Sequence, residues 1–389
     1  MLKCVGLYTR EVDEPELALS EILAQLSEKV ELMENTVGII MCHTEFVDSG
    51  VVKHIGENLP FEVAGSTTSA QAVNGLISEM ALAVFVITSD TVRFRLAMTE
   101  SMETEIEGPL RAAIERISND TEQPKLAIAF PPLMLKNSGD DIMEIWTKIL
   151  PEVPVFGTLA VDDSADLSGG KVIYRGEAEK IKHSFILFYG DINPRFLIAT
   201  LPEATKLPHK GEITKSKSNI VYEIDGRNAY DYLKNVGFAT AGESIGVFWF
   251  VPFLLSQQKR EDYDGVPVVR GLASVTEEGA AIFRGRIDEG SVFTLLNMTA
   301  EDVVVETKAK LLTINDMPDV NGVIVFSCVV RHLLHLHKNP LEEIEHANEA
   351  LADLPFMMSY AGGEFCPTSV KDGVPVNRFH NYSLVALVI

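Results

Sequence analysis

VGIIMCHTEFVDSG, at residues 37–50, is an apolar run that ends in a polar loop, and LPFEVAGSTTSAQ follows it at residues 59–71. Short apolar runs bounded by turn residues are typical of strands that are buried on both faces. A stretch of helical character separates the two pieces. Together they predict a strand, a helix and a second, proline-led strand that ends in a turn of small residues.

The same order of pieces returns roughly 90 residues later, which is a plausible size for a duplicated half-domain. KLAIAFPPLMLKNSGDDIMEIWTKIL (125–150) is again an apolar run, a loop and a helix. VPVFGTLAVDDSA (153–165) is again a strand that ends in small residues. The sequence therefore predicts an internal repeat.

Each unit continues with two β-rich runs around a short polar turn. LAVFVITSDTVRFRLAM (82–98) turns at Ser89-Asp90, and HSFILFYGDINPRFLIATL (183–201) turns at Gly190-Asp191. Such a pattern is the usual signal for a β-hairpin. We therefore expect the N-terminal region to consist of two similar strand–helix–strand–hairpin units.

A third variant of the unit closes the chain. VNGVIVFSCVVRHLLHL (320–336) is a strand that enters a helix or loop, and residues 341–354 have helical spacing with acids in the first turn. LPFMMSYAGGEF (354–365) is another proline-led strand, and YSLVALVI (382–389) is a final buried strand.

Strands that are apolar throughout need cover on both faces. We therefore expect an α/β or α+β fold, a layered sandwich of mixed sheets flanked by helices. The polar stretch 201–219 is a predicted linker or exposed loop, which divides the chain into domains at 1–200 and 201–389. Between the repeats, the predicted elements are a short helix at 226–237 and strands at 246–255, 266–275 and 290–297.

The charge argues against two classes of partner. The chain has 33 Lys and Arg against 56 Asp and Glu, a formal net charge of −23. Phosphate backbones and anionic membranes attract clustered cations, so we expect no nucleic-acid partner. No apolar run approaches the roughly 20 residues that span a bilayer, and no leader peptide is recognisable, so we expect a cytoplasmic protein without membrane insertion.

Seven segments, in order along the chain, resemble the FIST family of sensory modules. They are VAGSTTSA (63–70), VFGTLAVDD (155–163), GRNAYDYL (226–233), VVRGLASVTEEGAAIFRGRIDEGSVFTLL (268–296), FSCVVR (326–331), YAGGEF (360–365) and HNYSLVALVI (380–389). The resemblance covers essentially the whole chain, with an N-terminal and a C-terminal part.

The resemblance implies a sensory input protein that binds a small ligand, such as an amino acid, and is not an enzyme. It also implies a separate signalling effector, such as a kinase or a cyclic-dinucleotide enzyme, because this chain has no room for an effector domain. A homodimer is compatible with this role. Some members resembling the family bind haem and sense nitric oxide, so a haem sensor is the alternative to a sensor without a cofactor.

Four residues near the C-terminus form the first candidate ligand site: Cys328, Arg331, Glu364 and Asn381. Each lies at a predicted strand end, and strand ends converge at one rim of a sheet. Arg331 suits a carboxylate and Glu364 an ammonium group, which together would hold an amino acid. The alternative is that Arg331 and Glu364 form an ion pair that ties two strands together.

The small-residue turns form the second candidate site. Gly65, Ser66, Thr67, Gly157 and Thr158 offer hydroxyls and backbone N–H groups that could hold an anion. The alternative is that these hydroxyls only cap or bond locally.

Two further patterns suggest chemistry only weakly. His332, His335 and His337 could hold zinc or haem iron, but no carboxylate completes a known spacing, so we expect no metal site. Cys328 with His332 could meet across a helical turn, which leaves a cysteine-dependent hydrolase as an unfavoured alternative.

Overall fold

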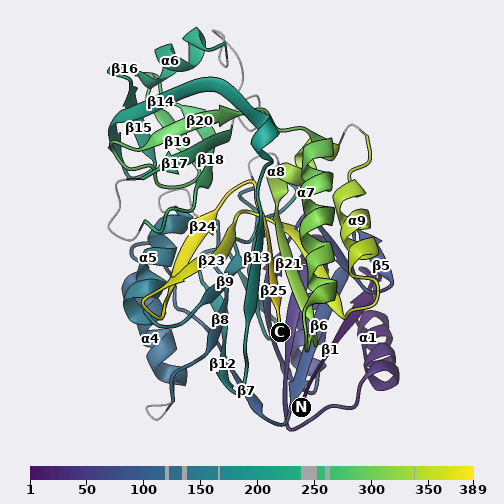
Figure 1. Ribbon diagram of the computed structural model, residues 1–389. Helices are drawn as coiled ribbons and strands as arrows, with labels where there is room; N and C mark the ends of the chain where they lie inside the picture. The colour runs from purple at the N-terminus through teal and green to yellow at the C-terminus, as the bar shows by residue number, and fades with distance from the viewer. Residues whose placement is uncertain (119–121, 134–137, 165–166, 238–251, 259–262, 337) are drawn as a thin grey trace.

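Three six-stranded sheets build the larger part of the molecule, here called the body, and a smaller seven-stranded sheet lies at one end of it (Figure 1). The computed structural model describes the chain except residues 119–121, 134–137, 165–166, 238–251, 259–262 and 337. The mixed α/β class predicted from the sequence is confirmed.

The strand orders of the three body sheets are as follows. The first sheet is β1 (Leu2–Thr9), β6 (Leu82–Ser89), β2 (Asn35–Cys42), β3 (Glu62–Thr67), β10 (Val172–Tyr174) and β11 (Glu177–Glu179). The second is β24 (Val374–His380), β23 (Glu364–Lys371), β9 (Val155–Thr158), β8 (Leu126–Phe130), β12 (Ser184–Gly190) and β7 (Val92–Met98). The third is β13 (Arg195–Ala199), β25 (Leu384–Val388), β21 (Val323–Cys328), β22 (Phe356–Ala361), β4 (Ala70–Val73) and β5 (Leu76–Ser78).

The inner faces of the three sheets share one apolar core. Phe85 from the first sheet, Phe130 and Phe156 from the second, and Phe326 from the third belong to it. The Phe156 and Phe326 rings stack with centroids 5.2 Å apart. This common core explains why strands of all three repeats are apolar on the face that a single sheet would leave open.

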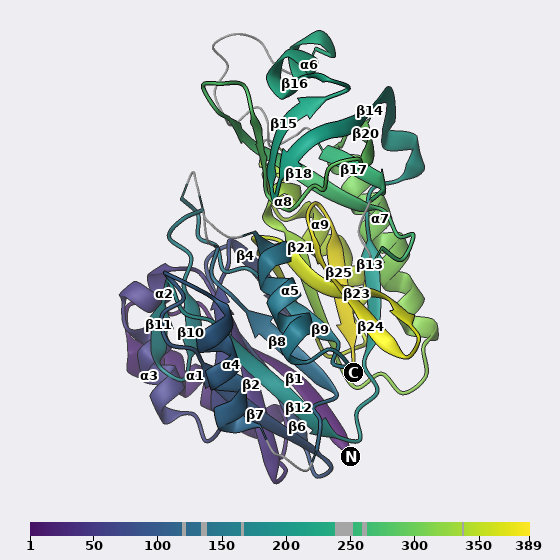
Figure 2. The ribbon, with the colours of Figure 1, turned by 90° about the vertical axis from the view of Figure 1, so that its left-hand side faces the viewer.

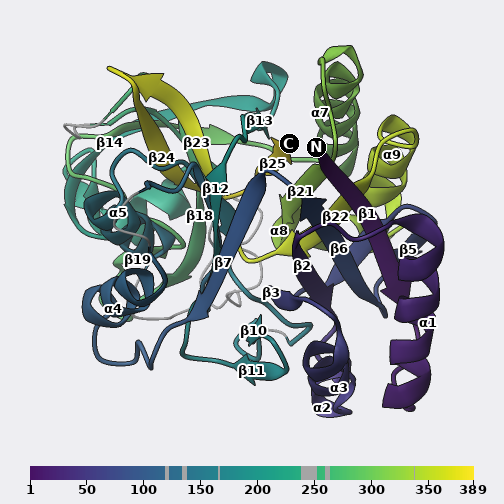
Figure 3. The same cartoon turned by 90° about the horizontal axis from the view of Figure 1, so that it is seen from below.

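A pair of helices covers the outer face of each sheet (Figure 3). The pairs are α1 (Pro15–Lys29) with α3 (Val51–Asn58), α4 (Glu107–Ile117) with α5 (Gly139–Ile149), and α7 (Ala300–Leu312) with α9 (Glu342–Ala350). Capping boxes start α5 at Ser138 and α7 at Thr299. The sequence repeat is therefore a repeat of sheet-plus-helix-pair units around the shared core, with α2 (Glu45–Asp48) and α8 (Val329–His335) as short additions.

The predicted hairpins at 82–98 and 183–201 are wrong. β6 pairs with β1 and β2 in the first sheet, whereas β7 pairs with β12 in the second. β12 and β13 likewise do not pair with each other, because β13 pairs with β25 in the third sheet. A short polar turn reverses the direction of the chain, but it does not determine which strands form hydrogen bonds. In both cases the strand after the turn joins the neighbouring sheet.

The smaller sheet has the order β14 (Lys206–Lys217), β20 (Val292–Leu296), β17 (Pro252–Gln257), β18 (Val268–Val275), β19 (Ala281–Phe283), β15 (Ile220–Ile224) and β16 (Arg227–Asn228). An additional pairing of β14 with β15 closes it into a barrel, which α6 (Ala229–Asn235) flanks. The polar stretch expected to be a linker is largely β14, because its alternating side chains suit a strand exposed on one face. Of the strand expected at 246–255, the part before Pro252 lies outside the described residues.

The chain leaves the body after β13 and returns to it at α7 (Figure 2). Strands from both sides of residue 200 share the second and third sheets, so the body is built from both halves of the sequence. No helix in the described part of the chain is long and apolar enough to cross a membrane.

Candidate ligand-binding site

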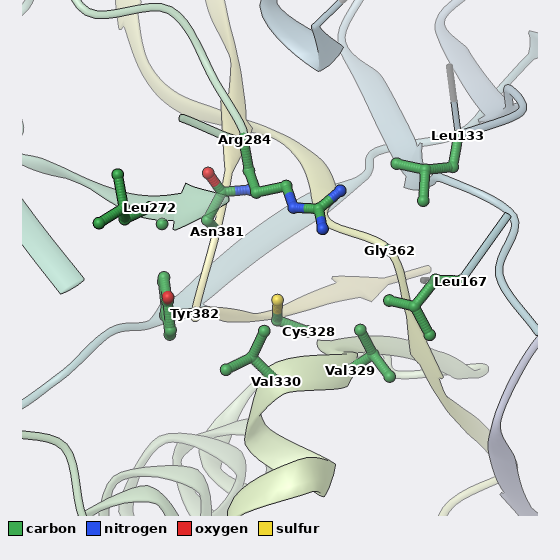
Figure 4. Close-up of a pocket in the computed structure, with 11 residues that line it drawn as sticks. Leu133, Leu167, Leu272, Arg284, Cys328, Val329, Val330, Gly362, Asn381 and Tyr382 are labelled. Carbon is green, nitrogen blue, oxygen red and sulfur yellow. The ribbon is translucent and has the colours of Figure 1, made fainter. Parts of the chain in front are cut away.

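A cavity that opens to solvent lies between the barrel and the carboxyl end of the third sheet (Figure 4), and its empty space, with the open solvent at its mouth included, is about 410 Å³. Its lining residues come from both units: Leu133, Leu167, Gly271, Leu272, Arg284, Cys328, Val329, Val330, Gly362, Asn381 and Tyr382. The carboxyl ends of strands are a common place for ligand sites in α/β proteins. The walls are mainly aliphatic, with a few polar groups among them.

Two of the predicted residues, Cys328 and Asn381, line this cavity. Cys328 is the last residue of β21, and Asn381 lies in the connection between β24 and β25. Asn381 is 3% exposed, and its Nδ2 donates to the His380 carbonyl, 3.1 Å away. Its Oδ1 is buried and has no hydrogen-bond partner among the described residues, which is unusual for a buried acceptor.

Arg284 is the cationic residue among the described lining residues, and sequence reasoning gave it no role. It follows β19 in the barrel, and its guanidinium is directed into the space above Cys328 (Figure 4). A guanidinium in an apolar cavity favours an anionic group. Its place in the site depends on the docking of the barrel on the body, which no local sequence pattern reveals.

The Cys328 thiol stays protonated near neutral pH. Burial raises its pKa far above the usual range. A thiol is a weak nucleophile compared with a thiolate. Cys328 therefore presents a small, uncharged side chain to the cavity.

Glu364 lies behind the cavity as the first residue of β23. Its side chain is fully buried, and neither carboxyl oxygen has a hydrogen-bond partner of normal geometry among the described residues. Burial raises the pKa of Glu364 well above its usual value, although the Arg331 charge opposes this. Burial therefore favours the neutral form of Glu364, and Glu364 is not among the described residues that line the cavity.

Replacing Glu364 with glutamine should stabilise the protein increasingly as the pH rises from 4 to 8. The unfolded chain loses the Glu364 proton above its ordinary pKa, whereas the native carboxyl keeps it, so native stability falls with rising pH. Glutamine removes this dependence because it does not titrate. Urea unfolding across this pH range measures the effect, with Glu31→Gln on the surface as control. A difference between variant and wild type that stays constant with pH would mean that native Glu364 is ionised.

Arg331 does not line the cavity. It is fully buried, and its Nη2 lies 2.7 Å from Oε1 of Glu343 and 2.8 Å from Oγ1 of Thr307. Its Nη1 donates to the Tyr382 carbonyl at 3.1 Å. The expected ion-pair partner, Glu364, is thus wrong, because α8 turns Arg331 toward α7 and α9 instead of toward β23.

The predicted small-residue turns are not turns but parts of strands. Gly65, Ser66 and Thr67 belong to β3, and Gly157 and Thr158 to β9. Thr67 donates to the Val161 carbonyl at 2.7 Å and Thr158 to the Gly363 carbonyl at 2.9 Å. Both bonds join segments that are remote in sequence, so the alternative of local bonding does not describe them either.

Close packing of neighbouring strands explains why Gly65 and Gly157 are glycines. A Cβ at Gly65 would lie 1.7 Å from the Ile40 oxygen, and one at Gly157 would lie 1.9 Å from the Ala129 oxygen. Both positions therefore allow close approach of parallel strands, and they correspond between the two repeats.

The histidines do not gather at the cavity. His332 stacks on Tyr360 with ring centroids 4.7 Å apart, and His335 lies 3.2 Å from Glu342, while His337 is outside the described residues. No described histidine lines the cavity, and the described residues contain no group of three metal-ligating side chains. The described lining of this cavity therefore contains no axial histidine for haem.

Comparison with known proteins gives two family matches: a FIST N domain over residues 36–227 and a FIST C domain over residues 229–367. A cyanuric acid hydrolase from A. caulinodans is similar in structure at 10% sequence identity and a TM-score of 0.40, covering 100% of this chain and 99% of that one. A second cyanuric acid hydrolase structure has 8% identity, a TM-score of 0.37 and coverage of 100% and 98%. No curated protein sequence matches the chain.

Proposed function

This chain belongs to the FIST family, whose domains are sensory domains for small ligands in signal transduction, and we propose that it binds its ligand between the barrel and the body. The observation that carries the proposal is the buried Oδ1 of Asn381, which has no hydrogen-bond partner among the described residues and belongs to a side chain that lines the cavity together with Arg284. Buried polar atoms are normally satisfied, so an orphan acceptor in a cavity favours a ligand donor there.

The lining residues suggest the chemistry of the ligand. The Arg284 guanidinium suits a carboxylate, and Asn381 Oδ1 suits an N–H or O–H donor. Leu133, Leu272 and Val329 provide apolar walls for a short side chain. An apolar amino acid, or a related small carboxylate with a donor group, fits this combination best.

Signal output is proposed to pass through the barrel. The cavity is lined by Gly271 and Leu272 of the barrel strand β18 and by Cys328 and Asn381 of the body. A ligand that contacts both units stabilises the docked arrangement more than any arrangement in which they separate. A separate effector protein would respond to this shift toward the docked arrangement, because the proposed role of this chain is ligand binding and not catalysis.

Asn381→Ala should weaken binding of the best ligand roughly tenfold, and Arg284→Ala roughly 10–100-fold, as expected for one neutral and one charge-assisted hydrogen bond. Isothermal titration with a panel of amino acids and related carboxylates identifies that ligand and measures both variants. Asn193→Ala and Arg227→Ala, which remove the same groups from exposed positions, serve as matched controls.

Two outcomes would contradict the proposal. One is that the wild-type protein binds no member of the panel. The other is that a ligand binds with the same affinity to Asn381→Ala and Arg284→Ala as to the wild type. A visible spectrum after incubation with haem tests the haem alternative separately, since a Soret shift would mark a bound porphyrin.

A further inference from the structure

Two bulky residues of the cavity wall have a left-handed backbone. Tyr382 has a φ of 59° and Leu167 a φ of 60°. This conformation is sterically costly for a large side chain, so it persists where the surrounding structure holds it, and such outliers concentrate at functional sites. The other described non-glycine residues with positive φ need no such support, because they lie in two-residue hairpin turns or are aspartates: Arg175, Ser218, Asp225, Asp319 and Asp372.

Tyr382 lies in the short connection between β24 and β25, directly after Asn381. Both residues line the cavity. The Tyr382 side chain is buried, and it packs on the barrel, because a Cβ at Gly271 would lie 2.8 Å from its Cε2 atom. The backbone conformation of Tyr382 therefore sets the direction in which this connection presents the Asn381 side chain.

Hydrogen bonds hold the chain on the C-terminal side of this φ angle. Nη1 of Arg331 donates to the Tyr382 carbonyl at 3.1 Å. The backbone N–H of Cys328 donates to the Ser383 carbonyl at 3.0 Å, and Oγ of Ser383 donates to the Asn381 carbonyl at 3.2 Å. Since the peptide after Tyr382 is held in place, a return of its φ to negative values would turn Asn381 away from its present position.

Arg331 is itself fixed by residues outside the cavity. Its Nε and Nη2 donate to Oε1 of Glu343 at 3.0 and 2.7 Å, and Nη2 also donates to Thr307 at 2.8 Å. Glu343 in turn accepts from Thr307 and Ser327. Because the guanidinium is planar, this anchoring fixes the direction of Nη1 toward the Tyr382 carbonyl. Thus α7 and α9, which contribute no described lining residue, support a strained residue in the cavity wall.

We propose that Arg331 is a positioning residue for ligand binding, which acts through the Tyr382 carbonyl and keeps the Asn381 side chain in the cavity wall. Because this role belongs to the same site, it rests on the proposed function. A purely structural role would need only the bonds to Glu343 and Thr307. The Nη1 bond instead ends on the strained residue of the cavity wall, where the conformation requires support from outside.

A double-mutant cycle tests whether Arg331 acts through Asn381. Isothermal titration with the twenty standard L-amino acids selects the one that binds the wild type best. Its affinity is then measured for Asn381→Ala, for the pair variant Arg331→Met with Glu343→Leu, and for all three substitutions together. The pair variant should bind roughly three- to tenfold more weakly than the wild type, since an effect that acts through Asn381 cannot exceed the loss caused by Asn381→Ala. When residue 381 is already alanine, replacing the pair should cost less than about twofold.

A crystal structure of the pair variant tests the positioning without any ligand. We expect Tyr382 to leave the left-handed region and Asn381 to move away from the cavity. Thr307→Val, which removes one anchor of Arg331, is the milder variant to use if the pair variant does not fold, and it should weaken binding about two- to threefold. Thr88→Val removes an equally buried hydroxyl from the first sheet, so it is the matched control and should leave the affinity unchanged.

Three results would overturn this role of Arg331. They are an unchanged affinity in the pair variant, an equal loss of affinity with and without the Asn381 side chain, and a crystal structure in which Tyr382 and Asn381 stay in place. Failure of all twenty amino acids to bind the wild type would instead refute the proposed function, and the crystal structure would then decide by itself whether Arg331 positions Asn381.

Discussion

Arg331→Ala should lower the free energy of unfolding by about 3–5 kcal/mol, as expected when one partner of a buried ion pair is removed. Arg331 and Glu343 are both fully buried, and their closest nitrogen and oxygen atoms are 2.7 Å apart. Glu343 also accepts from Thr307 at 2.6 Å and from Ser327 at 3.1 Å, so the pair joins α7, α9 and β21. Urea unfolding at pH 7 measures the loss.

The pH dependence of that loss is a second readout. The Glu343 pKa lies below its usual value although burial raises it, because the charge and hydrogen bonds of Arg331 outweigh burial. A lowered carboxyl pKa stabilises the native state above the unfolded pKa, and this contribution disappears as the pH falls. The difference between wild type and Arg331→Ala should therefore shrink as the pH falls from 7 toward 4.

A compensating double variant separates structure from ligand binding. Replacing both charged residues, as in Arg331→Met with Glu343→Leu, should recover most of the stability, since apolar substitutes for a whole buried pair are often neutral or better. If Arg331→Ala instead kept full stability but lost ligand affinity, then the guanidinium would contact ligand, as the sequence first suggested.

The sequence predicts the elements of this fold well and their partners poorly. The apolar runs that become β2, β8 and β21 are recognisable because each is covered on both faces, by the shared core and by helices. Which strand pairs with which is set by contacts that are remote in sequence. β7 and β13 each join the next sheet instead of pairing with the strand before them, and a short polar turn does not signal this choice.

Only part of the candidate site could be predicted from the sequence, because the rest depends on contacts that are remote in sequence. Cys328 and Asn381 follow from the rule that strand ends meet at one rim. Arg331 follows only two residues after Val329, where α8 begins, and that helical turn sends its side chain into the interior. Arg284 enters the cavity from the barrel, and sequence spacing contains no signal for the docking of one unit on another.

Asp140→Asn should separate the barrel from the body. Arg270, on β18 of the barrel, donates from Nη2 to both carboxyl oxygens of Asp140, at 2.8 and 3.0 Å. The two residues are 1% and 5% exposed, and Asp140 lies in the first turn of α5, where the helix dipole favours its negative charge. Arg270 also donates to the Phe379 carbonyl at 3.1 Å, so it ties the barrel to the segment that precedes Asn381.

The expected cost at this interface is about 3–5 kcal/mol, because asparagine leaves the buried Arg270 without its carboxylate. The barrel has its own apolar cluster, including Phe253 and Phe293, so it can remain folded when it undocks. If the barrel undocks without unfolding, the free energy of global unfolding should fall by less than this cost at the interface. Faster proteolysis near residues 200 and 298 and a larger radius of gyration in X-ray scattering should report it, in place of a large shift in global unfolding.

Arg286→Ala is the matched control, since the Arg286 side chain pairs with Glu144 across the same interface but is partly exposed. An exposed ion pair contributes about 0–1 kcal/mol, so this variant should keep the compact form. If Asp140→Asn were as compact and as resistant to proteolysis as Arg286→Ala, then the apolar contacts around Gly271 and Tyr382 would hold the barrel without the buried pair. In that case Gly271→Ala, whose Cβ would lie 2.8 Å from the Tyr382 ring, should produce the undocked form that Asp140→Asn did not.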